Sequence, residues 1–166
     1  MSLDNIQLPA IVLQDLFKKG LIDSKINQIK TVSAIKEKIE FLGKNEGKIL
    51  ILVNHPDCVF LPDAELNFLI GILTACKLTL NDVAIVNFCN NKKLNYEQLQ
   101  QFFDAAKIFA FDVLMSDILL PLQFPVYQVQ QYNEIIYMHA PPLQFLKQNK
   151  EEKLKLCASL QKIFSI

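Results

Sequence analysis

The sequence predicts an α/β domain in which helices cover both faces of a mainly parallel sheet of four to five strands, a three-layer α/β/α arrangement. Three observations predict it. Short apolar runs alternate with helical stretches, those stretches carry capping residues and apolar stripes, and apolar residues make up 51% of the chain. Such alternation favours a parallel sheet with right-handed crossovers. A chain of 166 residues has room for one such domain.

Residues 1–46 are predicted to form a helical segment before the α/β domain of residues 47–166. Apolar residues recur at helical spacing from Leu8 to Lys19, which indicates a short amphipathic helix. The lysine-rich stretch 23–46 indicates a second helix or a tether that orders late. The first helix either packs on its own domain or contacts a partner protein through Leu8, Ile11, Val12, Leu13, Leu16 and Phe17.

The α/β domain begins with the strongest strand signal, the continuous apolar run Ile49–Val53, which is typical of a strand buried on both faces. Acidic residues in the first turn and an apolar stripe predict a helix at residues 63–76. A second buried strand is predicted at residues 83–88, a helix capped by an asparagine at 96–105, and a third strand at 107–111.

The last third of the domain differs in character. Two prolines make residues 114–126 an extended linker or lid rather than a central strand. Alternating residues 127–132, followed by a turn at Asn133–Glu134, predict a hairpin. A long C-terminal helix follows, with Asn149 as a candidate break. Apolar residues of the linker would form an exposed strip for a partner, with Leu120 and Phe124 as its predicted contacts.

The composition argues against several classes of function. The formal net charge is zero, and all 17 basic residues are lysines, whereas arginine is the usual reader of phosphates and of guanine. We therefore expect no sequence-specific contact with nucleic acid. No apolar run approaches the ~18 residues of a membrane span, and the N-terminus lacks the order of a secretory signal. The four cysteines suit a reducing compartment, so we predict a cytoplasmic protein without membrane contact.

Two loops are candidates for chemistry. The loop Asn54–Cys58 follows the first strand and contains His55 and Asp57, while His139 closes the last strand. Ligands of open parallel sheets bind at the carboxyl ends of strands, where such residues would act as acid and base. The alternative is that these polar residues only cap and stiffen their loops. Because nucleotide-binding and metal-binding motifs are absent, we predict neither a cofactor nor a metal.

Several segments together resemble the psi subunit of the bacterial DNA polymerase III holoenzyme, over about residues 47–164. They are a helix beginning Pro62-Asp63-Ala64-Glu65-Leu66, a turn written Leu80-Asn81-Asp82-Val83, and a closing strand that runs into Ala140-Pro141-Pro142-Leu143. The resemblance implies a fold of the uracil-DNA-glycosylase type without glycosylase activity. It also implies a protein that bridges the clamp loader to the chi subunit, with Leu8–Lys19 as the segment that engages clamp-loader subunits.

Two alternatives remain open beside this non-catalytic role. Active uracil-DNA glycosylases carry a general-base Asp after the first strand and a His near the end of the chain, so an enzyme would use Asp57 and His139, with His55 nearby. The first loop lacks the Gly-Gln lead of those enzymes, and the second lacks their Ser. The other alternative is an α/β domain that self-associates through residues 119–124. The sequence does not determine the oligomeric state.

Overall fold

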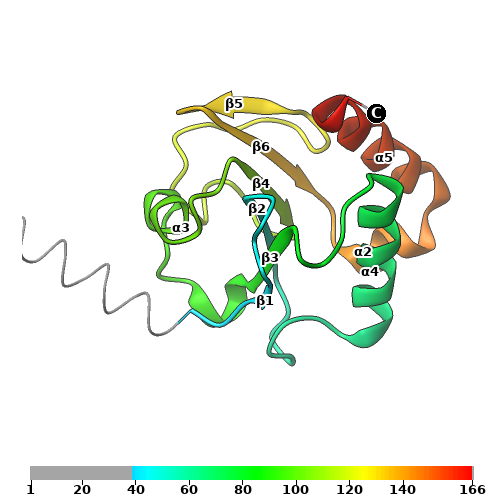
Figure 1. Cartoon of the computed structure of the whole chain (residues 1–166), viewed down its shortest axis with the longest axis horizontal. Helices are drawn as coiled ribbons and strands as arrows, with labels where there is room; N and C mark the ends of the chain where they lie inside the picture. The colour runs from blue at the N-terminus through cyan, green and yellow to red at the C-terminus, as the bar shows by residue number, and fades with distance from the viewer. Residues whose placement is uncertain (1–38, 166) are drawn as a thin grey trace, which may run out of the picture. The chain divides into compact units, whose positions relative to one another are not determined.

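A computed structural model of the protein describes residues 39–165 (Figure 1). Within this range, six strands form one sheet and four α-helices accompany it. The strands are β1 (Leu42–Gly43), β2 (Ile49–Val53), β3 (Val83–Asn87), β4 (Lys107–Phe111), β5 (Gln130–Tyr132) and β6 (Ile135–Ala140). The helices are α2 (Asp63–Ala75), α3 (Tyr96–Phe103), α4 (Leu143–Gln148) and α5 (Lys150–Phe164), and a short 3-10 helix, η1 (Phe88–Asn91), follows β3.

The sheet has the order β1-β3-β2-β4-β6-β5. Its four central strands β3, β2, β4 and β6 are parallel, and the two short edge strands are antiparallel to their neighbours. The predicted α/β class with a mainly parallel sheet is therefore confirmed. The prediction of four to five strands is wrong by one strand, because β1 lies in a stretch without an apolar run.

The prediction that residues 23–46 form a second helix or a late-ordering tether is wrong at Leu42–Gly43, which form β1. Gly43 has a φ of +107°, and a Cβ atom there would collide with the carbonyl oxygens of Val83 and Leu80. Only glycine permits this close approach to β3. The compact unit accordingly begins at Ile39, earlier than the predicted start at residue 47.

The helices lie in two layers, with α3 on one face of the sheet and α2, α4 and α5 on the other (Figure 1). The connection from β2 to β3 and the connection from β3 to β4 cross the sheet in opposite directions. Right-handed crossovers then place α2 and α3 on opposite faces. Alternate residues of β2 point to the two layers: Ile49, Ile51 and Val53 join the core beneath α2, α4 and α5, while Leu50 and Leu52 are equally buried on the opposite face.

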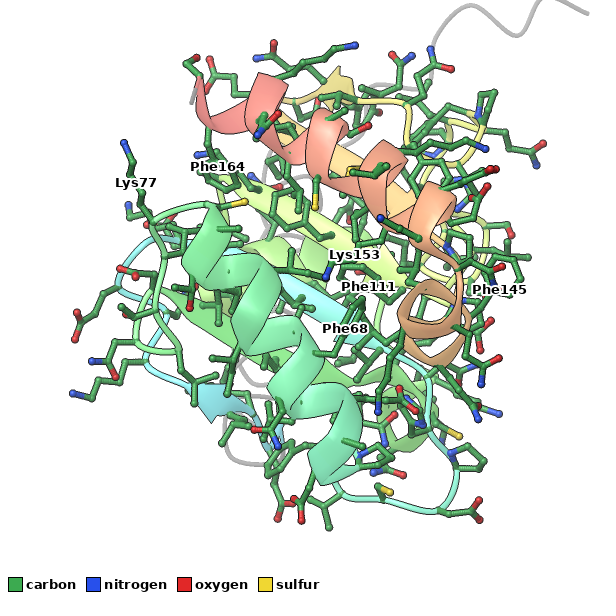
Figure 2. The ribbon with its side chains drawn as sticks, turned by 90° about the vertical axis from the view of Figure 1, so that its right-hand side faces the viewer. Phe68, Lys77, Phe111, Phe145, Lys153 and Phe164 are labelled. Atoms are coloured by element: carbon green, nitrogen blue, oxygen red, sulfur yellow. The ribbon has the colours of Figure 1, made fainter. Side chains whose placement is uncertain are left out.

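Figure 2 shows the layer of α2, α4 and α5 from outside. Nζ of Lys153 in α5 lies 5.4 Å from the ring centroid of Phe68 in α2, a cation–π contact between the two helices. The predicted break at Asn149 is confirmed, because this residue has an extended backbone and separates α4 from α5. Its side-chain Nδ2 donates to the carbonyl of Phe145, one of the last carbonyls of α4.

The predicted N-terminal helix and its contact positions, from Leu8 to Phe17, lie outside the described residues. Within residues 39–165, no helix is both long enough and apolar enough to cross a membrane.

Candidate functional site

The carboxyl ends of the four parallel strands meet at one edge of the sheet, as the topology requires. The loop Asn54–Cys58 leaves β2 there, β3 ends there in Asn87, Asp112 follows β4, and β6 ends there beside His139. The two loops that the sequence singled out therefore lie at the same edge of the sheet.

Asn87 holds the loop after β2 in place. Its side chain is almost completely buried, at 1% exposure. Oδ1 accepts hydrogen bonds from the backbone N–H groups of His55 and Cys89, and Nδ2 donates to the carbonyls of His55 (2.6 Å) and Cys58 (2.8 Å). The full capacity of the amide is used, so its burial is compensated. The sequence pattern predicts Asn87 only as part of a strand.

The imidazole Nε2 of His55 reaches the first turn of α2, while the residue also lines a cleft at this edge. Its Nε2 lies 2.9 Å from Oε2 of Glu65, in the first turn of that helix. Glu65 is buried, at 7% exposure, and its Oε2 has no well-aligned hydrogen bond within residues 39–165. The contact is close but poorly directed, and it becomes an ion pair when the imidazole is protonated. His55 is thus engaged by a buried carboxylate.

His139 is engaged by the linker before β5. Its Nε2 lies 2.8 Å from the carbonyl oxygen of Phe124, and the two rings meet edge to face with centroids 5.6 Å apart. The backbone carbonyl of His139 also accepts a hydrogen bond from the N–H of Tyr127. This histidine therefore holds the linker against β6.

Asp57, the third predicted catalytic residue, is exposed in the turn after β2. Among residues 39–165, no hydrogen bond or ion pair joins Asp57 to His55 or His139. The carboxylate that does reach the centre of the edge is Asp112, whose Oδ2 accepts a hydrogen bond of 3.3 Å from Nδ2 of Asn54. From the sequence, Asp112 could be recognised only as an acidic residue directly after a buried strand.

Clefts open along this edge at three places within residues 39–165. Two of them share Asn54 and Asp112. The larger has a volume of about 330 Å³ and is also lined by Phe88, Lys92 and Asp117. The other has a volume of about 240 Å³ and is also lined by Val53, His55, Phe111, Pro142, Leu143 and Gln144. The third, of about 230 Å³, is lined by Leu114, Met115, Ser116, Gln123, Phe124 and His139.

The linker after β4 is tied down although it is not a regular helix or strand. Four of its apolar residues are buried in the core, namely Val113, Met115, Ile118 and Leu120. The N–H of Tyr96 in α3 donates to the carbonyl of Ile118 (2.8 Å). Leu120, predicted to contact a partner, is only 4% exposed and is not available for that role, whereas Leu119 is 69% exposed. Phe124, the other predicted contact, is half-buried in the third cleft.

The side chains at the carboxyl edge of the sheet are mainly hydrogen-bonding and apolar groups. In the described part of the chain, no group of three or more His, Cys, Asp or Glu residues is placed to hold a metal ion. Burial, and then the nearby thiol of Cys157, raise the pKa of Cys76, which keeps that thiol protonated and unreactive. The sequence matches no protein-family model and no curated protein.

Proposed function

We propose that this protein is a non-catalytic accessory subunit of a replication clamp-loader assembly, similar to the psi subunit, and that it works by binding other proteins. One observation carries the proposal. The three residues that would form a catalytic site are engaged separately: His55 by Glu65, His139 by the Phe124 carbonyl, and Asp57 by solvent. General acid–base catalysis needs such groups within hydrogen-bonding reach of one another or of one substrate.

The uracil-DNA-glycosylase type of fold is part of the same proposal. Two features of the structure support it: helices on both faces of a mainly parallel sheet, and the loops after β2 and β6 at one sheet edge. Under the resemblance, these two loops stand in positions loosely similar to those of the catalytic loops of active glycosylases. In this chain the corresponding loops are stabilised by internal hydrogen bonds.

The direct test is affinity purification from the native cell extract with the full chain as bait, followed by identification of the bound proteins. We expect clamp-loader subunits to be enriched over a bait of unrelated sequence and equal net charge. The same subunits, produced separately, should then bind the purified chain in a two-component assay. Recovery of no clamp-loader or replication component would contradict the proposal.

A glycosylase remains the second candidate because of one observation, the cleft that Asn54 and Asp112 share beside the ring of Phe88. A carboxylate, an amide and an aromatic side chain are groups that can hold a flipped base. Incubation with uracil-containing single-stranded DNA tests it. Release of uracil by the wild type, lost in Asp112→Asn and retained in Asp57→Asn, would favour this enzyme over the accessory role.

A further inference from the structure

The sheet ends at β5, the outermost strand at the top of Figure 1. Among residues 39–165, β5 pairs with β6 alone, and a two-residue turn of Asn133 and Glu134 joins the two strands. Both turn residues have a positive φ, 48° and 65°, which is the geometry of a type I′ turn. The other side of β5 is an open edge, where unpaired backbone groups can bind a further strand.

The hydrogen bonds of β6 show which residue of β5 faces this open edge. The N–H of Ile136 donates to the carbonyl of Ala106, so the backbone of Ile136 faces the β4 side. Opposite residues of an antiparallel pair either exchange both of their hydrogen bonds or direct them away from each other. Gln131 is opposite Ile136 and therefore directs its N–H and its carbonyl to the open edge. No other segment within residues 39–165 bonds to these two groups, and the side chain of Gln131 is exposed.

The two neighbours of Gln131 have the opposite orientation. Gln130 is opposite Tyr137, and Tyr132 is opposite Ile135 beside the turn. These are the pairs that exchange hydrogen bonds within the hairpin, because such pairs alternate along an antiparallel ladder. The N–H and the carbonyl of Gln130 are consequently used inside the sheet. The centre of β5 thus presents one donor and one acceptor, both from Gln131, to an incoming strand.

Side chains that usually keep edge strands apart are missing from this edge. Natural edge strands commonly carry lysine or proline, which oppose pairing with another strand. Residues 126–133 contain neither a charged residue nor a proline. The next charge along the chain is Glu134 in the turn. A neutral strand of this kind can approach a copy of itself without repulsion.

We propose that β5 pairs antiparallel with β5 of a second copy of the chain, about a twofold axis beside Gln131. The N–H of each Gln131 then donates to the carbonyl of the other Gln131, and the two six-stranded sheets join into one. Because β5 has three residues, the contact is small and the dimer is reversible. The inference is independent of the proposed clamp-loader function.

The sequence of β5 is complementary to itself in this register. Tyr132 of one copy lies opposite Gln130 of the other, and Glu134 lies opposite Gln128, so no two like charges face each other. Tyr132 also forms an edge-to-face pair with Tyr96 of α3, with ring centroids 6.0 Å apart, and both residues are half-buried. Aromatic side chains of this kind are enriched at protein interfaces. A second copy therefore satisfies the backbone groups, the charges and the apolar area of this edge.

The first test uses the full chain and proline substitutions at two neighbouring positions. Sedimentation velocity of the wild type should show a monomer–dimer equilibrium that depends on concentration. Gln131→Pro should abolish the dimer yet keep the fold, because the N–H that it removes makes no bond within the sheet. The matched control is Gln130→Pro, which removes an N–H that bonds to β6 and should lower the thermal midpoint.

Two outcomes of this test would overturn the inference. A dimer that persists unchanged in Gln131→Pro would assign the contact to another surface, such as residues 119–124. A thermal midpoint that falls more in Gln131→Pro than in Gln130→Pro would reverse the orientation assigned to these two residues.

The second test places a charge at position 131, which the proposed axis sets opposite its own copy. Gln131→Lys and Gln131→Glu should each weaken the dimer by about 5-fold or more, whereas an equimolar mixture of the two should form a heterodimer. Gln148→Lys adds the same charge at the end of α4, a helix that lies away from β5 in Figure 1, and should leave the dimer unchanged. A mixture that stays monomeric where the wild type dimerises contradicts the register. A wild type that is monomeric up to about 1 mM, or that grows into open-ended oligomers, contradicts the twofold pairing itself.

Discussion

Nε2 of His139 donates a hydrogen bond of 2.8 Å to the carbonyl oxygen of Phe124. Since a carbonyl only accepts, the proton must reside on Nε2 of the ring. The bond joins β6 to a linker that has no regular secondary structure of its own. A histidine at the carboxyl edge of a parallel sheet, a position where catalytic groups are common, here has a structural role.

The variant His139→Ala should therefore destabilise the fold. It leaves the Phe124 carbonyl without its donor and removes the edge-to-face ring contact, at a cost of about 1–3 kcal/mol. His139→Gln keeps a donor at a similar reach and should recover part of that loss. Urea unfolding of the two variants measures the difference. Equal stability of the wild type and His139→Ala would show that the bond contributes nothing.

Asn87→Ala should be among the most destabilising single substitutions at this edge. It leaves the carbonyls of His55 and Cys58 and the N–H groups of His55 and Cys89 without their side-chain partner, which we expect to cost about 3 kcal/mol. The control is Asn90→Ala, whose exposed side chain makes only long contacts of 3.3 and 3.4 Å with the same loop. That variant should lose less than about 0.5 kcal/mol. Equal losses in the two variants would contradict the role assigned to Asn87.

Replacing a glycine by alanine should have opposite effects on stability at Gly43 and at Gly71. Gly43→Ala should destabilise the protein by about 2 kcal/mol or more, since the added Cβ would collide with the backbone oxygens of Val83, in β3, and of Leu80, in the turn before it. Gly71→Ala should stabilise it by about 0.5–1 kcal/mol, because Gly71 lies inside α2 with nothing within 4 Å of the new atom. Thermal unfolding of the pair tests both. A stabilising Gly43→Ala would show that β1 does not approach β3 as described.

Glu152 should make stability depend on pH in the acid range. Hydrogen bonds from Lys155 and from the hydroxyl of Tyr127, both 2.6 Å, lower the pKa of Glu152 below its ordinary value of 4.5. A lowered pKa contributes stability that is present above the unfolded-state pKa and is lost as pH falls through the folded-state pKa. The wild type should thus exceed Glu152→Gln in stability at neutral pH, and the difference should vanish in stronger acid.

The control for that pH dependence is Glu151→Gln, which removes the same charge from the same helical turn but no contact with Tyr127. Chemical unfolding measured from neutral pH down to about pH 3 separates the two variants. A difference for Glu152→Gln that stays constant across this range would contradict the assigned hydrogen bonds.

The strands of the core could be predicted because burial on both faces leaves a local signal. All five residues of β2 and of β3 are buried; β2 is predicted from an unbroken apolar run, and β3 from an apolar run that only Asn87 interrupts. The hairpin was predicted from a turn dipeptide, and Asn133 and Glu134 indeed have positive φ values of 48° and 65°, as a type I′ turn requires. β1 gave no such signal, because it has two residues and depends on one close glycine contact.

The sequence could indicate which loops lie at the candidate site, but not which of their side chains come into contact. Residues that follow a strand can be recognised, yet the order of strands in the sheet has no local signature. Asn54 and Asp112 meet because β2 pairs with β4, across a separation of 58 residues. Asp57 is nearer to Asn54 in the chain but turns to solvent. Leu119 and Leu120 differ in burial because the linker follows irregular turns, where neither helical nor strand periodicity applies.

The four hydrogen bonds of Asn87 have a kinetic consequence. They immobilise the loop after β2 during folding, so its conformational entropy is already lost before any ligand arrives. A molecule entering the adjacent clefts would encounter a rigid wall and need no loop closure, which removes one usual penalty of association. We then expect encounter rates set mainly by diffusion and charge, and related ligands to differ chiefly in residence time.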